Sequence, residues 1–86
     1  MEVMVREMIS VIDNFFPSIK AYANVEGNVS AKVAIPLPIF IRLVWIGRNA
    51  GEKLNNDPLQ IIQLKQIYYE YGMDWETDPL LTQGLT

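Results

Sequence analysis

The sequence predicts a small α+β fold with the element order α-β-β-α-α, in which an antiparallel hairpin packs against helices. Three observations lead to this prediction: helical spacing of apolar residues near the start, alternation over residues 18–35, and a second helical stripe after residue 57. The chain has 86 residues, of which 50% are hydrophobic and 20% are charged, which is typical of a globular domain with one core. We therefore expect a single α+β domain over residues 1–73 and a loosely ordered acidic C-terminal tail over residues 74–86.

The first predicted element is an amphipathic helix from Val3 to Phe16. Its apolar residues recur at helical spacing, with polar residues between them: Met4, Val5, Met8, Ile9, Ile12, Phe15 and Phe16. Pro17 follows directly, and a proline ring disrupts a helix interior. The helix is therefore expected to end before Pro17.

The alternating segment predicts a β-hairpin. A three-residue loop over residues 26–28 would place Val25 opposite Val29 and Ala23 opposite Ala31, with the apolar residues of both strands on one side. A two-residue loop would set apolar residues opposite polar ones, so the three-residue loop is preferred. Three residues of the apolar side are alanines, which would allow a helix such as the first one to approach closely.

Residues 39–46 allow two interpretations. The segment is rich in β-branched and aromatic residues and lies between Pro38 and Gly47, as a buried strand would. Alternatively, it begins a helix with Pro38 in the first turn and a stripe that continues through Leu43, Val44, Gly47, Ala50, Gly51 and Leu54. We favour the helix, because a strand would leave an unusually long loop after it. The small residues of the stripe would then let another element pack closely.

A further helix is predicted from the signals at its two ends. Asp57 is placed as the N-cap, Pro58 at the first helical position and Gly72 as the stop. The apolar stripe between them consists of Ile61, Leu64, Ile67, Tyr68 and Tyr71. The residues beyond Gly72 show no period.

The charge balance disfavours polyanions and membranes as partners. Seven Lys and Arg stand against ten Asp and Glu, for a net charge of −3. The apolar run over residues 33–47 is shorter than the roughly 20 residues that a membrane-spanning helix needs, and it contains Arg42. Glu2, Arg6 and Glu7 interrupt the apolar pattern that a secretory signal requires. We expect a cytoplasmic protein with no nucleic-acid partner and no membrane association.

No motif for catalysis, cofactor binding or metal binding is found. The chain has no cysteine and no histidine, which removes thiolate nucleophiles, imidazole bases and the usual zinc ligands. Asp74, Glu76 and Asp78 match the first ligands of a calcium loop, but Pro79 and Leu85 occupy the glycine and closing glutamate positions. Solvated tail charges are the preferred interpretation, and we expect a protein that is not an enzyme and carries no cofactor.

The remaining candidate is an interaction surface on the last two predicted helices. Apolar residues there border polar ones, and tryptophan, tyrosine and arginine are enriched at protein contacts. The candidate residues are Arg42, Trp45, Ile46, Asn49, Lys53, Ile62, Tyr69 and Met73.

These residues predict a non-enzymatic protein–protein interaction module, an accessory or regulatory subunit that self-associates as a homodimer and docks to other proteins. The sequence leaves open whether the dimer interface uses the hairpin edge or the helices. The alternative is a nucleic-acid-binding regulator that uses the two C-terminal helices.

Overall fold

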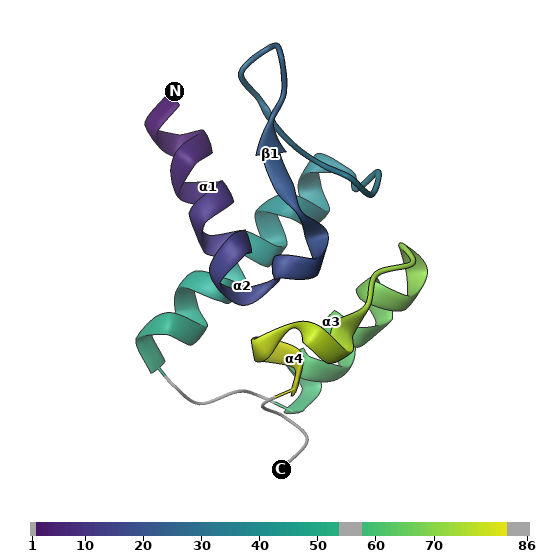
Figure 1. Ribbon diagram of the computed structural model, residues 1–86. Coiled ribbons are helices and arrows are strands. Elements are labelled where there is room, and N and C mark those ends of the chain that lie inside the picture. The colour runs from purple at the N-terminus through teal and green to yellow at the C-terminus, as the bar shows by residue number, and fades with distance from the viewer. Residues whose placement is uncertain (1, 54–57, 83–86) are drawn as a thin grey trace.

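The computed structural model describes residues 2–53 and 58–82, and over these residues the chain forms four α-helices and one two-stranded antiparallel hairpin (Figure 1). The α-helices and strands are α1 (Glu2–Phe15), β1 (Ala21–Ala23), β2 (Val29–Ala31), α2 (Leu37–Lys53), α3 (Pro58–Glu70) and α4 (Pro79–Thr82). Two 3-10 helices, η1 (Pro17–Ile19) and η2 (Trp75–Thr77), complete the order. The predicted α+β class and the order α-β-β-α-α are confirmed, with the short α4 added after them.

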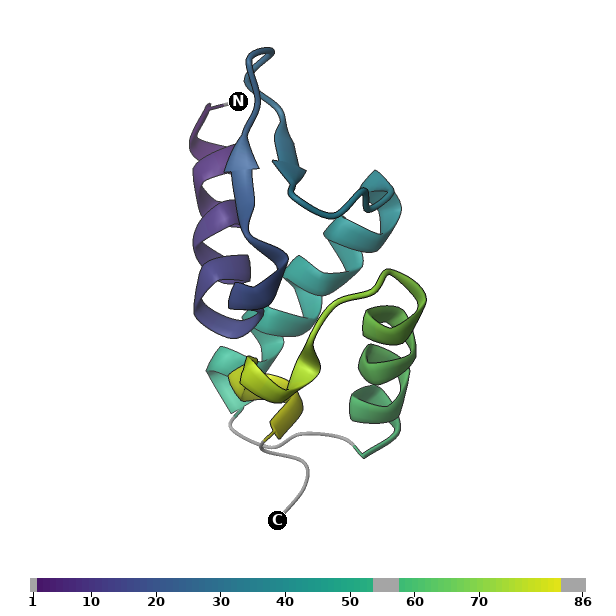
Figure 2. The same cartoon turned by 45° about the vertical axis from the view of Figure 1, so that its right-hand side comes forward.

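The elements form two neighbouring groups. The hairpin stands beside α1, and α2 passes behind the C-terminal end of α1, whereas α3 packs with α4 (Figure 2). One core joins both groups, and its fully buried large apolar residues are Ile12, Phe16, Ile19, Phe40, Leu43, Leu64, Tyr68 and Leu81. The rings of Phe16 and Tyr68 meet at a centroid distance of 6.3 Å. Burial of these side chains therefore holds the two groups together.

The first helix ends where the sequence predicts. α1 stops at Phe15, and Pro17 begins the single turn of η1 rather than continuing the helix. Lys20 then adopts a left-handed backbone conformation, with φ of 55°, and its N–H donates to the carbonyl of Pro17. This turn directs the chain back along α1, so that the hairpin and α1 lie together.

The hairpin is present, but its predicted register is wrong by two residues. Ala23 pairs with Val29 and Ala21 with Ala31, so the loop comprises residues 25–27 and Val25 is fully exposed instead of pairing with Val29. The cause is Asn24, whose side-chain oxygen accepts the backbone N–H groups of residues 26 and 28 and closes the turn one residue earlier.

The glycine of this loop makes the turn possible. Gly27 takes a φ of 82° and donates its N–H to the carbonyl of Asn24. Because the register error is an even number of residues, each strand residue still faces the predicted side, with Ala31 buried and Tyr22 exposed.

Residues 39–46 are helical, as favoured. Pro38 lies in the first turn of α2, and the carbonyl of Pro36 accepts the N–H groups of Ile39 and Phe40. The predicted close approach occurs at Gly47, where an added Cβ would lie 2.6 Å from Cγ1 of Val11 on α1. The absence of a side chain at this position therefore sets how closely α1 and α2 pack.

The end of α3 follows the predicted glycine stop, and its start agrees in part. The helix begins at Pro58, while the predicted N-cap, Asp57, lies outside the described residues. Gly72 has a φ of 68° and donates its N–H to the carbonyl of Tyr69, while the N–H of Met73 reaches the carbonyl of Tyr68 at 2.8 Å. These two bonds are the Schellman arrangement, which satisfies the carbonyls at the end of the helix.

The prediction of a loosely ordered tail over residues 74–86 is wrong for residues 74–82. Leu80 and Leu81 are buried in the core, and Asp78 is fully buried, so the packed body extends past residue 73 to at least Thr82. The absence of a helical period was misleading here, because one 3-10 turn and one α-helical turn are too short to generate a period. Residues 83–86 lie outside the described part of the chain.

Within the described residues, none of the helices has both the length and the apolar character needed to cross a membrane.

The contact at Gly47 yields a stability prediction. Gly47→Ala should lower the free energy of unfolding by about 1–3 kcal/mol, because the new methyl group would overlap Val11 by more than the gain in helix propensity offsets. Denaturant unfolding followed by circular dichroism measures the change. The control is the double variant Val11→Ala/Gly47→Ala, which should be more stable than the sum of the two single losses predicts. A stabilised Gly47→Ala protein would contradict the close packing of α1 and α2.

Candidate functional site

The described residues contain two candidate sites: a buried polar cluster around Asp78 and the exposed apolar surface of α2 and α3. The first lies where η1, α3 and the start of α4 meet. The second includes the residues that the sequence singled out.

The buried cluster joins three segments of the chain through one carboxylate. The backbone N–H of Ser18 donates to Oδ1 of Asp78 at 2.9 Å, and the Ser18 hydroxyl donates to Oδ2 at 2.5 Å. The hydroxyl of Tyr68 also donates to Oδ2. The donors on Ser18 and Tyr68 compensate the carboxylate for the water it loses, which allows Asp78 to be fully buried.

The phenol of Tyr68 is held in its neutral form by the same arrangement. Burial raises the pKa of Tyr68 most, and the hydrogen bond to Asp78 and the negative charge of that carboxylate raise it further. A tyrosinate formed here would face a carboxylate without water to screen it. The cluster therefore favours the protonated, neutral form of the Tyr68 phenol.

This cluster does not have the geometry of a hydrolytic site. A serine nucleophile needs a base that accepts its proton during attack, and a carboxylate that already accepts bonds from three donors is a poor one. A hollow of about 450 Å³ lies beside Ser18 and Thr77, yet the Ser18 hydroxyl is directed at Asp78. The arrangement ties α4 to η1 and α3, which is a structural role.

The acidic side chains of Asp74, Glu76 and Asp78 do not point to one common site. Asp74 and Glu76 are exposed, and the Asp74 side chain accepts the backbone N–H of Glu76 as the cap of η2. Asp78 faces the interior, so the prediction of a solvated tail charge is wrong for this residue. Among the described residues, no group of three or more acidic side chains is placed to hold a metal ion.

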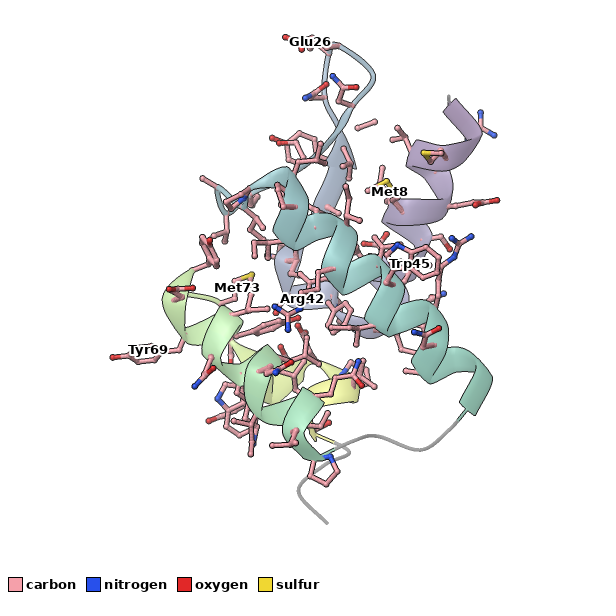
Figure 3. The ribbon with its side chains drawn as sticks, turned by 180° about the vertical axis from the view of Figure 1, so that it is seen from behind. Met8, Glu26, Arg42, Trp45, Tyr69 and Met73 are labelled. Atoms are coloured by element: carbon pink, nitrogen blue, oxygen red, sulfur yellow. The ribbon has the colours of Figure 1, made fainter. Side chains whose placement is uncertain are left out.

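Five of the eight candidate surface residues lie on the outside of the protein. Arg42, Trp45, Asn49, Ile62 and Tyr69 are exposed, with 59% of Trp45 and 88% of Tyr69 accessible to solvent. Figure 3 shows Arg42 on the side of α2 that faces α3, whereas Trp45 projects from α2 on the side nearer to α1 and Tyr69 points away from the body.

Three of the eight predicted surface residues are not seen on this surface. Ile46 and Met73 are corrected, because each is more than nine-tenths buried and belongs to the core. Met73 follows directly on the Schellman turn that ends α3. The side chain of Lys53 lies outside the described part of the structure.

The structure adds exposed residues that the sequence analysis missed. Leu37 and Ile41 precede Trp45 at intervals of four, and the three side chains are exposed by 55%, 43% and 59%. We call these three residues the α2 stripe. Their spacing was readable in the sequence, but it identifies an outward face only once the segment is known to be a helix.

A second exposed feature is a groove between α2 and α3, with a volume of about 1090 Å³. Ile39 and Arg42 line it from α2, and Ile62 and Tyr69 line it from α3. The Arg42 guanidinium donates to the side-chain oxygen of Gln63 at 2.8 Å, which joins the two helices across the groove. Trp75 completes the lining, and it was missed because it lies in the segment without a period.

Comparison of the chain with protein-family models, with curated proteins and with solved structures found no match. Its function is therefore inferred from its own residues.

The buried carboxylate yields a prediction about stability. Asp78→Ala should destabilise the protein by about 2–4 kcal/mol, because it leaves the buried donors on Ser18 and Tyr68 without an acceptor. Glu76→Ala, an exposed acidic residue on the same segment, is the matched control and should change stability by less than about 0.5 kcal/mol. Equal unfolding midpoints for the two variants would show that the cluster contributes little.

The raised pKa of Tyr68 predicts a loss of stability at alkaline pH. Folded Tyr68 keeps its proton, whereas in the unfolded chain it loses the proton near pH 10, so stability is present below about pH 10 and falls above it. The expected contribution is about 1.4 kcal/mol per pH unit. Denaturant unfolding between about pH 8 and pH 11 should show the free energy of unfolding falling more steeply for the native protein than for Tyr68→Phe. The variant keeps every other titratable group, so the difference reports Tyr68 alone. Parallel declines would contradict the assignment.

Proposed function

We propose that the protein is a non-enzymatic interaction module that acts by docking and that self-associates as a homodimer through the α2 stripe. The observation that carries the proposal is the exposure of Leu37, Ile41 and Trp45 on one face of a well-packed helix. Isolated exposed apolar residues are ordinary, but three large ones in a row on one helix are typical of a contact surface.

The spacing of the α2 stripe suits pairing with a second copy. Side chains at intervals of four form the ridge that packs into the groove of another helix. If two α2 helices pack antiparallel about a two-fold axis near Ile41, Leu37 of one copy meets Trp45 of the other, and the contact repeats symmetrically. The stripe runs over nine residues, or about 12 Å of helix between the first and the last, so residues beside it must contribute to a stable dimer.

The surroundings of the stripe are compatible with this contact. Arg48 forms a salt bridge with Glu7 of α1 at 3.2 Å, with both side chains about half exposed. This pair lies one turn beyond Trp45, so the charge next to the stripe is balanced rather than repulsive.

The hairpin edge has less support as the interface. Its strands are only three residues long, and Val29 and Val33 are partly buried against the core. Short strands offer few unpaired backbone groups to a second copy. The helical interface is therefore the one that we propose.

Nucleic-acid binding is the weaker alternative. Arg48 pairs with Glu7, so among Arg42, Arg48 and Lys65 only Arg42 and Lys65 share one surface without a salt bridge, and two cations are few for the phosphate contacts of a DNA-binding face. Binding to duplex DNA that weakens steeply with salt would favour that alternative over docking. A cytoplasmic location stays a prediction.

The dimer is tested by measuring the mass in solution. Light scattering at micromolar concentration should give twice the mass of the chain, and Trp45→Asp should give a monomer, because a buried aspartate at the symmetric contact would face apolar side chains. The matched control is Tyr22→Asp, which places the same charge on an aromatic residue 46% exposed on the hairpin and should leave the dimer intact.

Two results would contradict this proposal. A native protein that is monomeric at tens of micromolar, a range where dimers with micromolar Kd form, would exclude self-association. A dimer that survives Trp45→Asp but dissociates with Tyr22→Asp would place the interface on the hairpin.

A further inference from the structure

The groove between α2 and α3 is separate from the α2 stripe. Arg42 marks the side of α2 that lines the groove, and Trp45 projects from α2 on another side (Figure 3). The groove is lined by residues of both helices together with Trp75. Its occupant is therefore a question separate from the dimer.

The groove combines an apolar lining with two cations that form no salt bridge with any described carboxylate, Arg42 and Lys65. Arg42 donates to the neutral side chain of Gln63, and the ammonium group of Lys65 lies 4.3 Å from the centre of the Trp75 ring. Within residues 2–53 and 58–82, neither cation forms a salt bridge, in contrast to Arg48, which is paired with Glu7. The positive charge of Arg42 and Lys65 can therefore attract an anionic group of a ligand in the groove.

The sign of the charge here differs from that of the chain. Among the described residues that line the groove, Arg42 and Lys65 are positive and Glu70 is the one negative residue, whereas the chain as a whole carries −3. A locally positive region on an acidic protein attracts acidic groups to that place and repels them elsewhere. Charge complementarity therefore selects a partner with carboxylates.

The apolar lining narrows the chemistry of the partner further. Ile39 lies on the α2 side of the groove, Ile62 and Tyr69 lie on the α3 side, and Ile62 and Tyr69 are largely exposed. A small carboxylate ligand without apolar groups would leave Ile62 and Tyr69 in contact with water. A segment that carries apolar and acidic side chains together would cover them and meet the two cations at once.

We propose that the groove between α2 and α3 binds an acidic amphipathic peptide segment of another protein. Its apolar side chains contact Ile39, Ile62 and Tyr69, and its carboxylates pair with Arg42 and Lys65. This goes beyond the proposed dimer, because it assigns a different surface and a different partner.

The experiment uses a displayed library of random peptides, selected on the full-length protein. The peptides recovered should be enriched in Asp and Glu interspersed with apolar residues, and the best of them should bind more weakly as salt rises from about 50 to 500 mM. Affinity is measured by fluorescence anisotropy of the labelled peptides. No enrichment, or enrichment of neutral or basic peptides, would overturn the proposal.

Charge-reversed variants locate the binding site. Arg42→Glu/Lys65→Glu should weaken binding of the selected peptides by at least about tenfold, since two attractive pairs become repulsive. The matched control, Arg6→Glu/Lys32→Glu, makes the same change in net charge at exposed positions outside the groove and should change binding by less than about twofold. Unfolding curves of both variants verify that they are folded. Equal losses in the two variants would show that only net charge matters and would overturn the site.

The dimer assay separates this proposal from the previous one. Trp45→Asp should be monomeric and still bind the selected peptides, whereas Arg42→Glu/Lys65→Glu should remain dimeric. If the groove variant also dissociates the dimer, a second copy occupies the groove and the proposed partner is wrong. If the native protein is monomeric but binds acidic peptides through the groove, the peptide site stands without the dimer.

Discussion

The buried carboxylate of Asp78 is the interaction on which the arrangement of the two helical groups depends. It accepts hydrogen bonds from η1, which follows α1, and from α3, so one side chain links segments that are distant in sequence. Unlike apolar packing, these bonds have direction, and they fix the position of α4 relative to both neighbours. The burial of Leu80 and Leu81 follows, because Asp78 sets where their helix begins.

The same constraint determines which surfaces remain exposed. With α4 in place, the buried faces of α3 contact the core, and Ile62 and Tyr69 are left on its outer side next to the groove. On α2, the residues that contact α1 and the core are buried, and the α2 stripe faces outward. The two proposed contact surfaces, the α2 stripe and the groove, thus consist of side chains that the core does not bury.

Local signals in the sequence were sufficient for most of the elements. Pro17, Pro58 and Gly72 mark helix ends through backbone conformations that hardly depend on tertiary structure, and all three positions were predicted. The loop register was missed because the Asn24 side chain, rather than the pattern of apolar residues, closes the turn. The role of Asp78 was beyond reach, since its donors on Ser18 and Tyr68 are brought to it only by the tertiary fold. The exposure of the α2 stripe was likewise not predictable. Its spacing can be seen in the sequence, but which face of α2 points outward depends on the elements that pack against the other faces.

The close approach of α1 and α2 at Gly47 has a consequence for recognition. Because the backbone of α2 lies against Val11 and Phe15 with no side chain between them, the helix has little freedom to roll or slide on α1. The outer face of α2 is then held in one orientation before any partner arrives. A preorganised surface of this kind loses little conformational entropy when it docks, so even a small contact area can support specific association.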